Sequence, residues 1–238
     1  PSGSSSYPTV LFNAMVKPWT AFPIKGVIWY QGEANVGRSE QYGDLFPALI
    51  TDWRRQWRSD FPFYFVQLAN FMESKKIQPD SEWAALREAQ TKALKLDQVG
   101  MAVTIDIGLA DDIHPKNKQE VGRRLALVAL AGSYGKNVSS SAPVFQNYII
   151  KGNKMELDFG QKQDGFQIKG TTLKGFTIAG PDRVFYPAEA MVHDGKIILS
   201  STEVPAPLAA RYGWADNPDC NLYGENGLPV APFRTDCW

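Results

Sequence analysis

The sequence of 238 residues is poor in histidine and cysteine, with two of each, and no stretch approaches the roughly 20 apolar residues of a membrane helix. Two histidines cannot form a multi-histidine metal site within this chain. Neither a phosphate-binding loop nor a dinucleotide-binding glycine pattern is present. Lys and Arg together number 25, as do Asp and Glu, so the formal net charge is zero. We therefore expect no metal, no cofactor, and neither a nucleic acid nor a membrane as partner.

The remaining composition is that of an ordinary soluble globular protein, with 44% hydrophobic and 21% charged residues. Residues 1–6 (PSGSSS) read as a loop or a cut end, and no signal peptide is visible. The two cysteines, Cys220 and Cys237, both lie in the C-terminal tail. A disulfide in an exported protein and two unpaired thiols are equally compatible with the sequence.

The first half alternates between two hydrophobic periodicities. Short apolar runs predict strands, and apolar residues at helical spacing predict helices. Ser39 is the predicted N-cap of the first helix. The predicted strands are residues 24–30, 63–68 and 99–107, and the predicted helices are residues 40–58, 82–96 and a third from Pro115 to Gly132 or Gly135. This alternation predicts a parallel sheet with helices on both faces.

The second half has a different pattern from about Ala142 onward. Short β-like runs are separated by turn signals such as Lys151-Gly152-Asn153 and Asp194-Gly195. They predict a small antiparallel β region packed on the α/β part, with the tail from Arg211 as an ordered strap. We therefore divide the chain into an α/β domain, residues 1–140, and a β-rich domain with its tail, residues 141–238.

The two histidines differ in their surroundings. His193 precedes the turn dipeptide Asp194-Gly195, which predicts a solvent-facing side chain. His114 follows the predicted strand 99–107, at the sheet edge where open α/β proteins place their sites. Asp111, three residues earlier, is able to hold the imidazole Nδ1–H and leave Nε2 free as a base. Helix capping by the neighbouring carboxylates is an equally good explanation on spacing alone, and Asp112 is expected to point elsewhere.

A second polar group follows the first predicted strand. Gln31 has an amide able to donate to a developing oxyanion, and Gly32 allows a tight bend. Glu33 suits a general acid or base, a sugar-binding group or a supporting carboxylate, while a plain loop with a capping carboxylate explains the same residues. No nucleophile elbow is present, and the serine-rich segments 4–6 and 139–141 do not follow a buried strand.

Taken together, these motifs resemble the sialate O-acetylesterases of the SGNH (GDSL-type) hydrolase superfamily. The resemblance runs from about Pro8 to Trp238. Its motifs are GVIWYQGE at 26–33, DDIHP at 111–115, and FTIAG, YGWADNP, NLY and PFRT in the tail, from residue 176 onward. It implies a hydrolase of O-acetylated sialic acids in which His114 is the base, Asp111 its partner and Gln31 the oxyanion donor, with Glu33 in support.

The sequence departs from the family pattern in one respect. The family's nucleophilic serine lies in an N-terminal Gly-Gln-Ser-Asn block, and this chain has no such block. We therefore expect an incomplete SGNH sheet whose open edge is covered by an upstream segment that carries the serine. The chain alone would be inactive. The resemblance also implies a secreted, periplasmic or lysosomal protein.

Two alternatives remain open. A related acetylesterase acting on another sugar, such as acetylated xylan, shares the QGE and DxxH motifs. A carbohydrate-binding module that has lost catalysis is consistent with the missing serine, but the retained Gln31, Asp111 and His114 argue against it.

Overall fold

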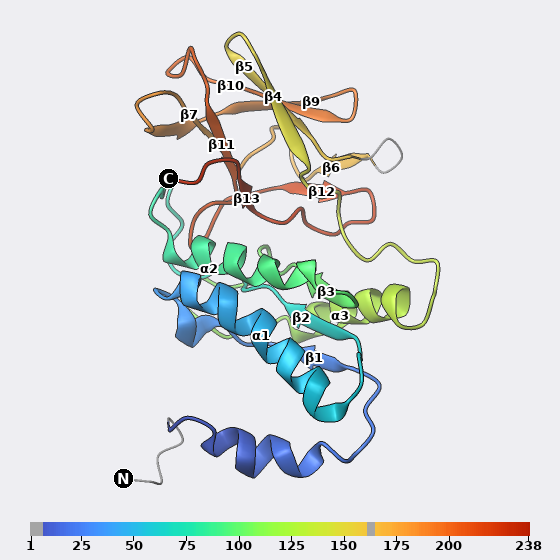
Figure 1. Ribbon diagram of the computed structural model, residues 1–238. Helices are drawn as coiled ribbons and strands as arrows, with labels where there is room; N and C mark the ends of the chain where they lie inside the picture. The colour runs from blue at the N-terminus through green and yellow to red at the C-terminus, as the bar shows by residue number, and fades with distance from the viewer. Residues whose placement is uncertain (1–6, 161–164) are drawn as a thin grey trace.

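The computed structural model describes residues 7–160 and 165–238. Its first part holds a parallel sheet of three strands, β1 (Val27–Trp29), β2 (Phe63–Val66) and β3 (Val99–Ala102), in the order β1-β2-β3. The antiparallel strands all lie further along the chain and form the second part (Figure 1). The predicted mixed α/β fold with an additional antiparallel β region is confirmed.

Three helices cover the parallel sheet: α1 (Ser39–Trp57), α2 (Glu82–Thr91) and α3 (Lys118–Gly132). All four residues of β2 are buried, and alternate side chains face opposite sides. Phe63 and Phe65 pack in one core with apolar residues of α1 and α2. Tyr64 faces the other way, and its hydroxyl lies 2.7 Å from the Ser133 Oγ at the end of α3. Both faces of the sheet are therefore covered, as the alternation predicted.

Several element boundaries differ from the prediction. Strand β3 ends at Ala102 rather than residue 107, because the chain turns where the Ile107 N–H donates to the Thr104 carbonyl. Helix α3 begins at Lys118 rather than Pro115, because Asn117 is its N-cap and accepts the Glu120 N–H. Two further corrections are smaller: Ser39 is the first residue of α1 rather than its cap, and α2 continues as a 3₁₀ turn, η4 (Lys92–Lys95).

The second part consists of short antiparallel strands around a separate apolar core. One sheet has the order β4-β5-β10-β9 and a second the order β13-β11-β7-β8, while β12 pairs with β6. Asp194 and Gly195 join β9 to β10 with positive φ at both residues, as expected for this hairpin dipeptide. The strands are β4 (Asn147–Lys151), β5 (Lys154–Asp158), β6 (Phe166–Ile168), β7 (Phe176–Ala179), β8 (Phe185–Pro187), β9 (Glu189–His193), β10 (Lys196–Ser200), β11 (Ala209–Tyr212), β12 (Leu222–Gly224) and β13 (Phe233–Arg234).

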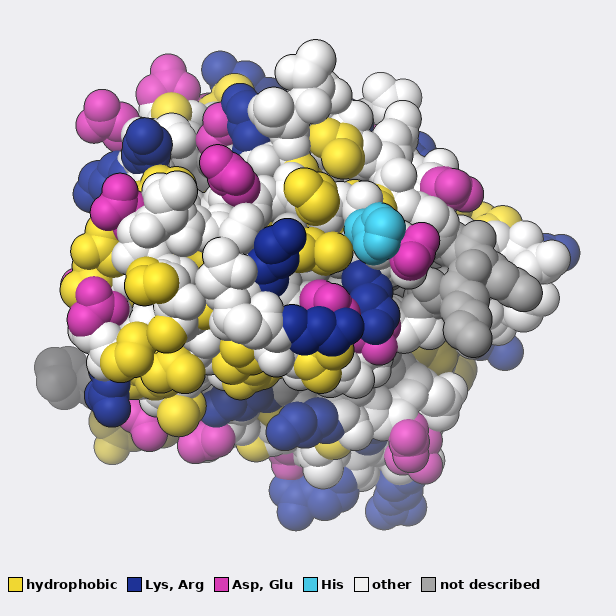
Figure 2. Space-filling model, turned by 90° about the horizontal axis from the view of Figure 1, so that it is seen from above, with side chains coloured by type: hydrophobic (Ala, Val, Ile, Leu, Met, Phe, Trp, Pro, Cys, Tyr) yellow, Lys and Arg dark blue, Asp and Glu magenta, His cyan; other side chains and the backbone are white. Residues whose placement is uncertain are grey.

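The C-terminal tail is more regular than a strap. It supplies β12 and β13, and it also binds the α/β part. The buried Arg87 of α2 donates to the carbonyls of Ala215 and Asp216, and Arg234 forms an ion pair of 2.8 Å with Glu88. The two parts are therefore joined by specific polar contacts. On the face seen in Figure 2, acidic and basic side chains are interspersed, in keeping with the zero net charge.

The edge strand β1 and the first described residues expose apolar side chains. Strand β1 pairs with β2 alone among the described strands, and its Ile28 is 71% exposed. Two short helical segments, η1 (Phe12–Val16) and η2 (Lys17–Trp19), lie at one end of the molecule (Figure 1). They expose large apolar side chains, among them Met15 and Trp19. No helix among the described residues is long and apolar enough to cross a membrane.

Candidate active site

An open cleft of about 340 Å³ brings together three of the predicted site residues, Gln31, Glu33 and His114. Gln31 follows β1, Glu33 begins the short 3₁₀ helix η3 (Glu33–Asn35), and His114 lies in the loop between β3 and α3. Because β1 and β3 run parallel, the segments that follow them emerge at the same sheet edge. The lining residues are Tyr30, Gln31, Glu33, Ala34, Ile113, His114, Pro115 and Lys118.

The Gln31 side chain is held at both ends of its amide. Its Nε2 donates to the Asn35 Oδ1 at 2.7 Å, and its Oε1 accepts from the Tyr42 hydroxyl at 3.2 Å. An amide nitrogen carries two N–H groups, so one remains to donate to a ligand. Neither Asn35 nor Tyr42 was predicted as a site residue from the sequence. Their orienting role depends on α1 folding back over the loop.

The backbone of this loop is fixed by a buried glutamine of α2. The Gln90 Nε2 donates to the Gln31 carbonyl at 3.3 Å, and its Oε1 accepts the Leu68 N–H at 2.9 Å. A Cβ on Gly32 would lie 3.1 Å from the same Gln90 Nε2 and 3.2 Å from a Leu68 methyl group. Gly32 therefore allows a close approach between the Gln31 loop and the end of β2.

His114 is exposed, with 86% of its side chain accessible. Its backbone N–H donates to the Asp112 Oδ1 at 2.9 Å, a local turn that brings this carboxylate within 3.7 Å of the imidazole Nδ1. No hydrogen bond or ion pair among the described residues joins Asp111 to His114. Asp112 is thus the nearer carboxylate, contrary to the expectation that it would point elsewhere, and the role of Asp111 stays a prediction.

Two further residues of the cleft were not singled out from the sequence. Tyr30 has a buried hydroxyl without a hydrogen-bond partner among the described residues, and burial together with the negative Glu33 raises its pKa to about 12. The Lys118 ammonium lies 5.0 Å from the Tyr30 ring centroid. Lys118 is four residues after His114, but Tyr30 is distant in the sequence, so the contact between Lys118 and Tyr30 could not be predicted from spacing. It places a positive charge at the cleft.

Hydrogen bonds hold the start of the loop that carries His114, at Asp106 and Gly108. Arg124 of α3 is buried and donates to both carboxylate oxygens of Asp106, at 2.6 and 3.0 Å, and to the Val103 carbonyl at 2.7 Å. The Gly108 N–H donates to the Asn70 Oδ1 at 2.7 Å. The loop is thereby anchored to α3 on one side and to the segment after β2 on the other.

The described residues contain no cluster suited to a metal ion and no disulfide. No group of three or more His, Cys, Asp or Glu side chains is placed to hold a metal ion there. Cys220 and Cys237 are not bonded to each other, and burial raises the pKa of the Cys220 thiol to about 12. His193 ends β9 with 66% of its side chain exposed, as predicted. The described lining of the cleft contains neither serine nor cysteine.

Comparison with known proteins assigns the family. Residues 2–131, more than half of the chain, match the model of the carbohydrate esterase, sialic acid-specific acetylesterase family. The chain belongs to this family. The family assignment agrees with the resemblance inferred from the WYQGE and DDIHP motifs.

Relatives in this esterase family match nearly the whole chain. The sialate O-acetylesterases of Mus musculus and Homo sapiens are each 32% identical over 255 residues, covering 94% of this chain and 47% and 48% of the relative. The crystal structure of a carbohydrate acetylesterase from Xanthomonas citri is 46% identical, with a TM-score of 0.92, over 97% of this chain and 55% of that one. The chain spans about half the length of the relatives it matches.

Proposed function

We propose that this chain provides the base and an oxyanion donor of a carbohydrate O-acetylesterase that acts on O-acetylated sialic acids. The observation that carries the proposal is that Gln31 and His114 line the same cleft. Gln31 is oriented by Asn35 and Tyr42, as an oxyanion donor needs to be before the reaction begins.

The proposed reaction is acyl transfer through a serine. The His114 Nε2 takes the proton of the serine hydroxyl as its oxygen attacks the acetyl carbonyl. The resulting oxyanion accepts a hydrogen bond from the Gln31 N–H. When the intermediate collapses, the ester C–O bond breaks and the imidazolium gives its proton to the departing sugar oxygen, which leaves as a hydroxyl group. Water then attacks the acetyl-enzyme by the same route and releases acetate. Asp111 is the proposed partner of the imidazole, and the proximity of Asp112 to Nδ1 makes it the competing candidate.

The serine is proposed to come from a segment outside this chain. The absence of serine from the described lining supports this, as does the space open to one side of β1. A preceding strand would pair with β1 and cover Ile28, which is 71% exposed. We expect this chain alone to release no acetate, because no serine hydroxyl belongs to the described lining of the cleft at His114.

Two experiments test the proposal in the full-length protein. The first is labelling with a serine-reactive phosphonate followed by peptide mapping. A label within this chain would refute the external serine, whereas a label upstream that is lost in His114→Ala supports a two-piece site. His193→Ala is the matched control and should label normally. The second is Gln31→Ala, for which we expect kcat to fall about 10²–10³-fold. An unchanged kcat would remove Gln31 from the oxyanion site.

The substrate has a competing candidate. The more similar Xanthomonas citri protein is described as a carbohydrate acetylesterase, so an acetylated sugar other than sialic acid, such as acetylated xylan, is the second proposal. Acetate release from O-acetylated sialic acid and from acetylated xylan, compared as kcat/KM, distinguishes the two. Release from neither, with intact sugar binding, would favour a carbohydrate-binding module.

The site of action is also proposed. By its resemblance to sialate O-acetylesterases, we infer that the native protein is secreted, periplasmic or lysosomal. The two unbonded cysteines add no support. Fractionation of the native source with an antibody against this chain tests the inference, and recovery solely from the cytosol would contradict it.

A further inference from the structure

The loop that carries His114 is also held from the β-rich part of the molecule. The hydroxyl of Tyr223, in β12, donates to the Asp106 Oδ2 at 3.1 Å, beside the two hydrogen bonds from Arg124 to the same carboxylate. Tyr223 is 5% exposed, and the Asp106 side chain is 10% exposed. Water therefore competes little for this hydrogen bond, and its charged acceptor strengthens it. Tyr223 ties the β-rich part to the residue from which the loop departs.

A second link to the same loop runs through two asparagines. Asn217, which follows β11, accepts a hydrogen bond from the Asn70 Nδ2 at 2.7 Å. Asn70 in turn accepts the Gly108 N–H with its Oδ1 at 2.7 Å. The Asn217 side chain is itself fixed, because its Nδ2 donates to the Met72 carbonyl at 2.6 Å. One side chain thus joins a residue of the C-terminal tail to a residue of the loop.

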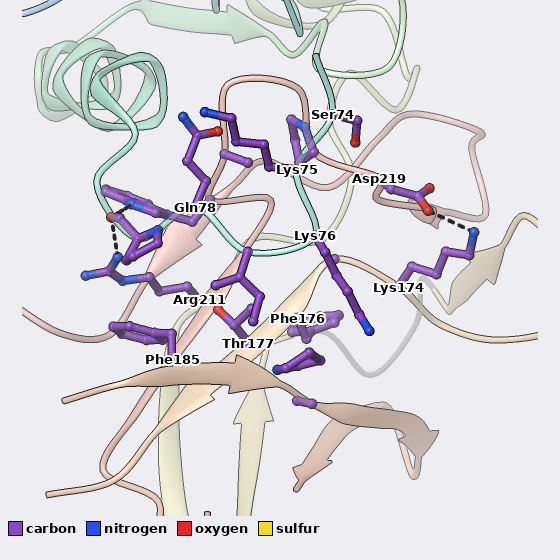
Figure 3. Close-up of a pocket in the computed structure, with 18 of the residues that line it drawn as sticks. Ser74, Lys75, Lys76, Gln78, Lys174, Phe176, Thr177, Phe185, Arg211 and Asp219 are labelled. Atoms are coloured by element: carbon purple, nitrogen blue, oxygen red, sulfur yellow. Dashed lines mark hydrogen bonds and ion pairs between the residues drawn. The ribbon is translucent and has the colours of Figure 1, made fainter. Parts of the chain in front are cut away.

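The β-rich part is fixed against the α/β part near these links. A cleft of about 460 Å³ lies along the junction, and hydrogen bonds join its two walls (Figure 3). The Pro79 carbonyl accepts from Arg211 at 2.8 Å and from the indole N–H of Trp214 at 3.0 Å. A Cβ on Gly213, whose φ is +60°, would lie 3.2 Å from the Cδ1 of the buried Ile105. The segment after β11 is therefore packed closely against the start of the loop, and a hydrogen bond from it has a rigid base.

Beyond its anchored start, the loop has few directional contacts of its own. Among the described residues, 110–115 form no hydrogen bond with another element, and the bond from the His114 N–H to Asp112 is local. Ile113 packs on the apolar core of α1 and α2, and Pro115 is buried. Apolar packing keeps the loop on the protein but is not directional, whereas hydrogen bonds are. The direction in which the imidazole points therefore depends on how the start of the loop is held.

We propose that Tyr223 and Asn217 position the His114 loop for catalysis, so that the β-rich part is needed for the geometry of the active site. Neither side chain lines the cleft at His114, so both are positioning residues that act through Asp106 and Asn70. The proposal rests on the proposed role of His114 as the base, because a base must lie within hydrogen-bond reach of the proton that it takes. A displacement of about 1 Å at such a group lowers a rate by as much as about 10²-fold.

Kinetics of the full-length protein with the substitutions Tyr223→Phe and Asn217→Ala provide the first test. We expect kcat for acetate release to fall about tenfold in each variant and about 10²-fold in the double variant, with KM unchanged. Tyr212→Phe is the matched control, because it also removes a buried hydroxyl of the β-rich part. That hydroxyl accepts the Leu222 N–H at 3.1 Å, so its loss should lower Tm but leave kcat unchanged.

NMR of the histidine-labelled full-length protein gives a second readout that does not depend on catalysis. The imidazole C–H signals of His114 and His193 are assigned from their loss in His114→Ala and His193→Ala. We expect the His114 signal to shift or broaden in Tyr223→Phe and in Asn217→Ala. The His193 signal should stay in place in both variants, and Tyr212→Phe should leave both signals as in the wild type.

Two results would overturn the proposal. An unchanged His114 signal in both variants, whatever their kcat, would mean that the loop does not depend on these links. A fall in kcat that follows the loss of Tm across all variants, Tyr212→Phe included, would mean that only the folded fraction had changed. A shifted His114 signal with unchanged kcat would instead support positioning of the loop and refute His114 as the base. Failure of this proposal and failure of the proposed function are therefore distinguishable.

Discussion

The contact between the two parts of the molecule can be tested at Arg87, a guanidinium that is 0% exposed. Its N–H groups donate to four backbone carbonyls: Leu68 and Ala69 at 2.9 Å, Ala215 at 2.7 Å and Asp216 at 2.8 Å. The first two follow β2 and the other two follow β11. This one side chain therefore joins the end of the parallel sheet to the C-terminal segment.

The substitution Arg87→Met removes all four hydrogen bonds while keeping a long apolar side chain. The Ala69 and Asp216 carbonyls keep other donors, the Trp83 indole N–H at 2.8 Å and the Phe71 N–H at 3.2 Å. The Leu68 and Ala215 carbonyls have no other donor among the described residues, and each costs about 1–3 kcal/mol when left without a partner. Against this stands the desolvation of the guanidinium, since burial lowers the pKa of Arg87 to about 9, and its removal returns several kcal/mol. We expect a net loss of about 1–3 kcal/mol. In a protein of this size that lowers Tm by roughly 2–12 °C.

Denaturant unfolding of the wild type and Arg87→Met provides the measurement. Arg87→Lys should be intermediate, because an ammonium has three N–H groups for four acceptors. Arg55→Met is the control: Arg55 is exposed on α1, and its pair with Asp52 should be worth less than about 1 kcal/mol. A loss below about 1 kcal/mol for Arg87→Met would refute the account, since it would mean that the carbonyls are satisfied without the guanidinium.

Two other predictions concern the loop before α3 and the start of that helix. Hydrogen bonding from Arg123 is the main cause that lowers the pKa of Glu120 to about 2, so the stabilisation by ionised Glu120 is present above pH 4.5 and lost as pH falls toward 2. The stability difference between the wild type and Glu120→Gln should accordingly shrink from pH 6 to pH 3 in urea unfolding, and a constant difference would contradict this. In Gly108→Ala the new Cβ would lie 1.8 Å from the Asn70 carbonyl oxygen, so we expect a loss of about 1–3 kcal/mol or more. Gly122→Ala, with nothing within 4 Å, should instead be neutral or stabilising by up to about 1 kcal/mol in thermal unfolding.

Local patterns predicted much of the fold because the forces involved act over a few residues. The apolar run FYFV predicted a buried strand and forms one, and the turn at Asp194-Gly195 follows from backbones that tolerate positive φ. The prediction failed where apolar residues are buried by distant partners. Residues 103–107 continue the apolar run of β3, yet the Thr104 hydroxyl donates to the Gln67 carbonyl and the chain turns. Strands as short as β8 and β13 have too few residues to display a period.

For the site, the sequence by itself determined which groups are available: one histidine after a strand, and a Gln-Gly-Glu segment after another. Chemical type and position along a parallel sheet are local properties, so His114 and Gln31 could be predicted as site residues without coordinates, and the structure brings both to one cleft. Tertiary structure alone decided how they are held. Asn35 and Tyr42 orient the Gln31 amide, and Asp112 rather than Asp111 approaches the imidazole. Such contacts depend on ångström-scale placement of packed elements, which no spacing in the chain encodes.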